Sequence, residues 1–93
     1  MNKDLAETIS YQAVAYILDD HKRLDHFMRE TGLGINDFQN LENAPETLAG
    51  VLDFLLSYED LLLDFCATNN LQPDIPMRAR HQFPGFGQEF QTP

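Results

Sequence analysis

Residues 51–66, VLDFLLSYEDLLLDFC, decide how this chain folds. The stretch contains six leucines together with Phe54, Tyr58 and Phe65, and the polar run 57–60 interrupts it near the middle. So many leucine and phenylalanine side chains have to be buried when the chain is in water. We therefore expect two helices that meet at the polar run, with the rest of the chain packed around them.

Length and composition limit what can be built around this stretch. The chain has 93 residues, which is enough for one domain with a modest core. Its hydrophobic content of 43% is typical of a globular protein. The formal net charge of −9 repels nucleic acid backbones, anionic membranes and acidic partners. We therefore expect neither nucleic acid nor membrane binding.

The sequence also predicts where the protein resides. The first ten residues lack the basic and apolar regions of a signal peptide. No apolar run approaches the roughly 20 residues that span a bilayer. The single cysteine, Cys66, excludes an intramolecular disulfide and a cysteine-based zinc site. A cytoplasmic location and the absence of a cofactor are the resulting predictions.

The periodicity predicts an all-α fold, a compact bundle of five or six short helices. Apolar residues recur every three or four positions over residues 5–18, which indicates one helix face. A second helix is predicted to begin at Asp19 or Asp20, because a continuous helix would place His21 and Asp25 on the apolar stripe. Gly32 is expected to end it in a left-handed conformation.

Further helices are predicted over residues 36–41, 45–56, 58–68 and 77–82. Ser57 and Asp60 have the spacing of a capping box, so Ser57 is expected to cap the helix that follows it. Asn69 and Asn70 are expected to end that helix, because asparagine tolerates positive φ. No segment shows the alternation of a strand.

A weak internal repeat relates the two halves of the chain. A shift of 38 residues aligns Ile17 with Leu55, Leu18 with Leu56, Leu24 with Leu62, Phe27 with Phe65, Met28 with Cys66, Gly32 with Asn70 and Leu33 with Leu71. The pattern predicts two α-hairpins, each followed by a short helix. Two hairpins can bury their apolar faces against each other, whereas one hairpin cannot.

The C-terminal residues differ in character from the rest. We predict a single helical domain over residues 1–82 and a Gly/Pro/Phe-rich tail or strap over residues 83–93. Phe83, Phe86 and Phe90 have two interpretations: they dock into pockets of a partner, or they cover the core of this domain. We favour the second, since the core would otherwise be underfilled.

The helix-packing residues also resemble those of a known family. The similarity covers about residues 5–80 and rests on an alanine-containing first helix, on Leu24, Phe27 and Met28 before residues 31–33, and on residues 51–56 followed by 61–65. This combination resembles a family of small alphaproteobacterial proteins catalogued as a domain of unknown function. The resemblance implies a short, all-helical, bacterial, cytoplasmic protein. It implies no catalytic residue, cofactor or partner.

Few residues offer chemistry. Asp19, Asp20, His21 and Asp25 cluster at a helix start, and His21 and Asp25 are four apart, as two metal ligands on one helix face would be. No His-x-x-x-His or Glu-x-x-His pairing accompanies them, and a capped, solvated helix start explains the cluster equally well. Cys66 lies near a helix C-terminus, where the helix dipole disfavours a thiolate. We therefore predict a protein that is not an enzyme.

The charges are distributed unevenly. Residues 1–75 carry 14 acidic residues against 4 lysines or arginines, a net charge of −10. Arg78, Arg80 and His81 form the only basic end, and two arginines are too few for nucleic acid binding. An acidic protein that mimics nucleic acid stays open as an alternative.

The prediction for function is a protein-interaction adaptor or regulator that binds another protein, with a homodimer as one form. It rests on the missing chemistry, the acidity and an excess of leucine. We expect Tyr58, Leu61 and Leu63 to form an exposed apolar patch, because not all of them can share the face of Leu62 and Phe65. The alternative class is a small metal-binding or enzymatic protein that uses the cluster of Asp19, Asp20, His21 and Asp25.

Overall fold

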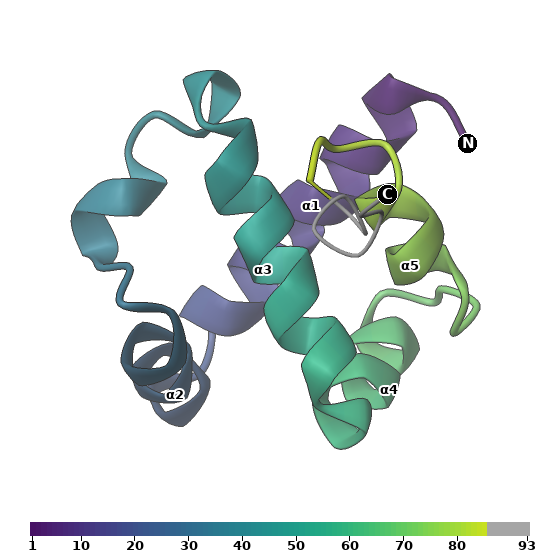
Figure 1. The fold of residues 1–93 in the computed structure, drawn as a ribbon. Coiled ribbons are helices and arrows are strands. Elements are labelled where there is room, and N and C mark those ends of the chain that lie inside the picture. The colour runs from purple at the N-terminus through teal and green to yellow at the C-terminus, as the bar shows by residue number, and fades with distance from the viewer. Residues whose placement is uncertain (86–93) are drawn as a thin grey trace, which may run out of the picture.

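The apolar stripes wind as five α-helices within the part of the chain that the structure describes, residues 1–85. In this computed structural model the elements are α1 (Lys3–Leu18), α2 (His21–Thr31), the 3-10 turns η1 (Ile35–Phe38) and η2 (Leu41–Asn43), α3 (Pro45–Ser57), α4 (Glu59–Thr68) and α5 (Ile75–Arg80). Figure 1 shows α1 and α3 crossing at the centre, with α2 on one side of α3 and α4 and α5 on the other. The predicted all-α fold is confirmed, and no strand occurs within residues 1–85.

Local chemistry sets the helix ends. The Asn2 side chain accepts a hydrogen bond of 2.8 Å from the backbone N–H of Leu5 and so caps α1. Gly32 ends α2 with a φ of 77°, as predicted. Asn70, just after α4, has a φ of 57°. These two residues are aligned by the 38-residue shift, so both halves turn in the same way after their second helix.

Two features of the predicted helices were wrong. The helix expected over residues 36–41 is replaced by η1 and η2, because polar side chains close tight turns there, including Asp37, which accepts from the backbone N–H of Gly34 at 2.7 Å. Ser57 does not cap α4. Its hydroxyl donates to the carbonyl of Asp53 at 2.8 Å, so Ser57 is the last residue of α3, and the extended backbone of Tyr58 makes the break.

The core lies where α1 and α3 cross. The largest fully buried side chains come from all five helices and include Ile17, Phe27, Leu48, Leu52, Leu55, Phe65 and Pro76. Small residues on α1, Ala6, Ser10 and Ala13, are completely buried and allow α3 and α5 to pack closely against it. The hydroxyl of Ser10 donates to the carbonyl of Ala6 at 2.8 Å, so this buried polar group is satisfied.

Aromatic contacts reveal how the two halves of the repeat pack. The rings of Tyr16 and Phe65 meet edge to face with centroids 5.5 Å apart, and those of Phe54 and Phe27 do the same at 5.3 Å. The 38-residue shift turns the first pair into the second with the halves exchanged. The second helix of each half therefore contacts the first helix of the other half. These contacts are related to each other by an approximate internal two-fold symmetry.

Arg80 ties the C-terminal segment to the body of the domain. Its side chain is 5% exposed, and its Nε donates to Asp53 Oδ1 at 2.7 Å. Its Nη1 donates to the carbonyls of Phe83 and Pro84 at 3.2 and 3.3 Å. One arginine of the predicted basic end is therefore not available at the surface, because Arg80 is buried against the carboxylate of Asp53 on α3.

The segment beginning at Phe83 was expected to be a tail or strap. Phe83 is only 4% exposed and belongs to the core, so the packed domain extends one residue past the predicted boundary at residue 82. Phe83 agrees with the favoured interpretation, in which the aromatic residues cover the core. Docking of a partner by Phe83 was wrong, because its ring is not accessible. Phe86 and Phe90 lie outside the described residues.

We expect Arg80→Met to lower the free energy of unfolding by about 1–3 kcal/mol, since it removes hydrogen bonds made by a charged group while preserving most of the packed side-chain volume. Urea denaturation measures the change. Arg78→Met is the matched control, because Arg78 is half exposed and pairs with Asp74 only at 3.8 Å. A control effect above about 0.5 kcal/mol, or an equal effect of both variants, would contradict the structural role of Arg80.

Candidate functional site

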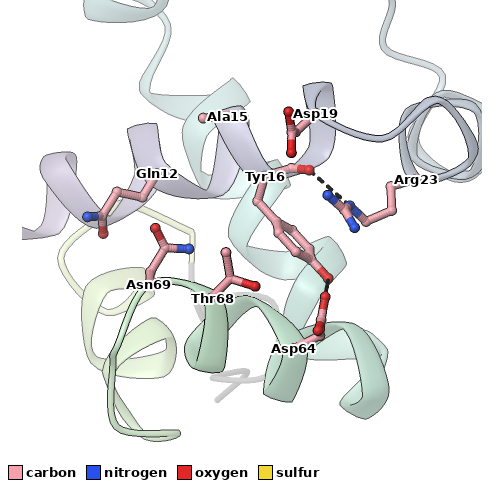
Figure 2. Close-up of a pocket in the computed structure, with 8 residues that line it drawn as sticks. All are labelled: Gln12, Ala15, Tyr16, Asp19, Arg23, Asp64, Thr68 and Asn69. Atoms are coloured by element: carbon pink, nitrogen blue, oxygen red, sulfur yellow. Dashed lines mark hydrogen bonds between the residues drawn. The ribbon is translucent and has the colours of Figure 1, made fainter.

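A groove lies between α1 and α4 on one side of the molecule. It encloses about 450 Å³ and is lined by Gln12, Ala15, Tyr16, Asp19, Arg23, Asp64, Thr68 and Asn69. We call it the α1–α4 groove. Figure 2 shows α1 along one wall and α4 along the other, with Arg23 reaching in from α2. The last two turns of α1 and the second half of α4 therefore supply almost all of the lining.

Tyr16 connects the two walls of the groove. Its hydroxyl donates to Asp64 Oδ2 at 2.6 Å, across 48 residues of chain (Figure 2). Its carbonyl, one of the last four of α1 and so without a partner in that helix, accepts from Arg23 Nε at 2.9 Å. The guanidinium carbon of Arg23 also lies 3.7 Å from the centre of the Tyr16 ring, which is a cation–π contact.

The environment of Tyr16 changes its acidity. Burial raises the pKa of the Tyr16 hydroxyl to about 12, and its hydrogen bond to Asp64 contributes to the rise, while the positive charge of Arg23 opposes the shift. Tyr16 is therefore neutral at any physiological pH. It acts as a hydrogen-bond donor that holds Asp64 in place.

One polar group of the groove has no hydrogen-bond partner among residues 1–85. Gln12 Oε1 is buried and has no hydrogen-bond partner within residues 1–85. Figure 2 shows the side-chain amides of Gln12 and Asn69 directed into the same part of the groove from opposite walls. Asn69 Nδ2 donates to the carbonyl of Phe65 at 3.0 Å. A buried acceptor without a partner costs roughly 1–3 kcal/mol, so a ligand that donates to Gln12 Oε1, once this part-exposed side chain turns to present it, would recover this free energy.

The internal symmetry places a second groove between α2 and α3. It encloses about 240 Å³ and is lined by Glu30, Thr31, Gly50, Asp53, Phe54, Ser57 and Tyr58. We call it the α2–α3 groove. The 38-residue shift relates six positions of the two linings: Gln12 to Gly50, Ala15 to Asp53, Tyr16 to Phe54, Asp19 to Ser57, Glu30 to Thr68 and Thr31 to Asn69. Arg23, Asp64 and Tyr58 have no counterpart in the other lining.

The two grooves differ in how their polar groups are bonded. In the α2–α3 groove the hydroxyl of Tyr58 donates to the carboxylate of Glu30, and Asp53 accepts from Arg80. The hydroxyl of Thr31 donates to the carbonyl of Phe27 at 2.7 Å. These bonds lie within the protein. The α1–α4 groove is larger and retains an acceptor without a partner among residues 1–85, so it is the better candidate for a binding site.

The expected apolar patch is mostly absent. Leu63 is 47% exposed, but Tyr58 and Leu61 are half-buried and pack against the core. The reason is helical spacing: the positions that face the core are Tyr58, Leu61, Leu62, Phe65 and Cys66, which follow the pattern i, i+3, i+4, i+7, i+8. One wide stripe accommodates both neighbouring leucines and leaves Leu63 on the opposite side. The prediction of a three-residue patch was therefore wrong.

The four residues considered as metal ligands, Asp19, Asp20, His21 and Asp25, do not come together at one point. Asp20 lies 3.9 Å from Arg23, and Asp25 pairs with Arg29 at 3.2 Å. His21 is exposed. No group of three or more His, Cys, Asp or Glu side chains within residues 1–85 is placed to hold a metal ion. Asp19 alone of the four lines the groove.

Cys66 is buried at the end of the core-facing stripe of α4. It is 3% exposed, and its thiol donates to the carbonyl of Gln72 at 3.7 Å. Burial raises the pKa of the Cys66 thiol, and the negative charge of Asp74 adds to the shift. Both effects suppress the thiolate, so the position is poorly suited to a nucleophile.

Several residues of the α1–α4 groove were missed at the level of sequence. Tyr16 was assigned to the apolar face of a helix, and Asp64 and Gln12 were not singled out. The repeat relates these positions, because it makes Tyr16 equivalent to Phe54 and Asp64 equivalent to His26. His26 and Phe54 are indeed in contact, with ring centroids 4.9 Å apart. Without knowledge of the exchange between halves, this pairing could not be inferred.

Comparison with known proteins identifies a family and nothing closer. Residues 3–86 match the family model described as protein of unknown function (DUF3572). No curated protein and no solved structure matches the chain. No helix in the described part of the chain is long and apolar enough to cross a membrane.

We expect ultraviolet titration of the tyrosines to show a component near pH 12 that disappears in Tyr16→Phe. Because the folded state holds this proton more tightly than the unfolded state, the contribution of Tyr16 to stability is complete below about pH 10 and is lost as the pH rises towards 12. Urea denaturation across that range should show a shallower decline for Tyr16→Phe. Tyr11→Phe is the control, and loss of the component in that variant would contradict the assignment.

We expect the thiol of Cys66 to react slowly with an aromatic disulfide reagent at pH 7, and rapidly once urea unfolds the domain, because burial restricts access and suppresses the thiolate. The rate of labelling, followed by absorbance, should track the unfolded fraction. Rapid labelling of the folded protein would contradict this and would support a reactive cysteine.

Proposed function

Since the chain belongs to the family of proteins of unknown function DUF3572, we propose its function from its own structure: it is a non-enzymatic protein that binds a segment of a partner protein in the α1–α4 groove, as an adaptor or regulator. One observation carries the proposal. Of two grooves related by the internal symmetry, one has its polar groups bonded within the protein, and the other keeps an acceptor without a partner among residues 1–85.

Exposed apolar side chains on α1 and α4 support the same proposal. Tyr11, Leu18 and Leu63 are 39%, 43% and 47% exposed. Each is the immediate neighbour in sequence of a residue that lines the groove, namely Gln12, Asp19 and Asp64. Tyr11 and Leu18 are seven apart and lie on one face of α1, with Ala15 between them. Exposed apolar side chains on the two helices that form a polar groove resemble the mixed surfaces by which proteins bind one another.

A cytoplasmic location is part of the proposal. Cys66 is present as a free thiol in the core, which suits a reducing compartment.

We expect affinity capture from a lysate of the source cells to recover one or more proteins that are lost with Leu18→Lys and with Leu63→Lys. A lysine on either side of the groove would remove apolar contact area and place a polar chain there. The recovered proteins are identified by mass spectrometry, and circular dichroism checks that each variant is folded.

Ile35→Lys is the matched control for the capture experiment. Ile35 is 53% exposed and lies on η1, outside the lining of the groove, so the same substitution should leave capture unchanged. If all three variants recover the same proteins as the original chain, binding does not use the α1–α4 groove. Loss confined to Ile35→Lys would place the binding surface on η1 and overturn the proposal.

A further inference from the structure

We infer that the segment bound in the α1–α4 groove is a basic peptide. Its Lys or Arg side chain pairs with Asp19 and Asp64, and its backbone N–H donates to Gln12. The inference rests on the proposed function and deepens it by naming the chemistry of the partner.

Several hydrogen-bond acceptors line the groove. Gln12 Oε1 has no partner within residues 1–85, and Asn69 uses its Nδ2 on the carbonyl of Phe65, which leaves its Oδ1 as the group to present. Asp19 and Asp64 add two carboxylates. The matching ligand is therefore rich in donors. Lys and Arg side chains carry donors only, and a peptide N–H supplies the remaining donor for Gln12.

Charge favours the same ligand. Among the residues that line the groove the one cationic side chain, Arg23, is already bonded to the carbonyl of Tyr16, stacked on its ring and close to Asp20. Asp60 lies near enough to Tyr16 to affect its ionisation, so it adds a further negative charge beside the groove. Together with the net charge of −9, these carboxylates attract a basic segment from a distance and accelerate its association.

The same charges argue against other occupants. A nucleic acid or an acidic peptide would be repelled by Asp19, Asp64 and the field of the whole chain. A second copy of the chain would bring another net charge of −9 to the interface. A basic segment of a different protein meets neither penalty.

Asp64 is positioned for this role before any ligand binds. The 2.6 Å bond from the Tyr16 hydroxyl fixes Oδ2, and the neutral state of Tyr16 keeps that donor in place. Asp64 Oδ1 is then left for a cation. Preorganisation of this kind lowers the entropic cost of binding.

The experiment is a titration of isotope-labelled protein with N-acetyl-arginine N-methylamide, which carries one cation and two peptide groups. Nitrogen–proton correlation spectra should show saturable shifts of the side-chain amides of Gln12 and Asn69. The glutamate analogue of the probe should bind at least about tenfold more weakly, which corresponds to roughly 1.4 kcal/mol. Binding of the arginine probe should weaken as salt is added.

Two double variants test the electrostatic part. Asp19→Asn with Asp64→Asn should abolish the preference for arginine over glutamate, while the amide oxygen introduced at position 64 can still accept from the Tyr16 hydroxyl. Glu42→Gln with Glu46→Gln makes the same change in net charge away from the groove and should preserve the preference. If both double variants lose the preference equally, the selectivity comes from net charge alone and the inference is overturned.

Gln12→Ala tests the peptide-group contact. It should weaken binding of the arginine probe severalfold, whereas Gln39→Ala, an exposed position outside the groove, should not change it. Equal binding of the arginine and glutamate probes, shifts confined to the α2–α3 groove, or no saturable shift would each overturn the inference. None of these results depends on the capture experiment. If the probe experiments fail but Leu18→Lys and Leu63→Lys still lose captured proteins, the proposed function is preserved, and the partner has a different chemistry.

Discussion

The exchange of aromatic contacts between the two halves is the constraint on which the rest of the structure depends. Tyr16 of α1 meets Phe65 of α4, and Phe54 of α3 meets Phe27 of α2, each edge to face. Neither half can form either pair alone, because each pair takes one ring from each half. The crossing of α1 and α3, the positions of α2 and α4 beside them (Figure 1) and the two grooves all follow from these contacts.

The two grooves show how a repeated architecture can acquire different chemistry. Where α3 presents Phe54 to His26 and Tyr58 to Glu30, the α2 and α3 helices lie close together and their groove is small. Where α1 presents Tyr16 to Asp64, the helices stand farther apart and the groove is larger. The hydroxyl of Tyr16 requires an acceptor once it is buried. Position 16 is a tyrosine, whereas the equivalent position 54 is a phenylalanine. This difference accounts for the carboxylate of Asp64 that faces the candidate site.

Most of the fold could be predicted from the spacing of residue types along the chain. The breaks before His21 and at residue 58, and the left-handed ends at Gly32 and Asn70, depend on interactions within a few residues and could be predicted. The wrong prediction of a patch on α4 could have been avoided from the sequence, because an apolar stripe of the usual width already includes both Leu61 and Leu62. The cap at Ser57 was a different case. Its hydroxyl had two acceptable partners, one in each helix, and the choice of the Asp53 carbonyl is visible only in the structure.

The sequence by itself determined that this protein is helical, acidic and free of recognisable catalytic motifs, and it predicted two related halves. It determined these things because helix periodicity, charge and repeats are properties of neighbouring residues or of simple sums. Only the tertiary structure decided that the halves exchange partners, that Arg80 binds Asp53, and that Gln12 and Asp64 share one groove. These contacts join residues far apart in the chain. Their separation in space is set only when the core forms, so it cannot be read from the sequence.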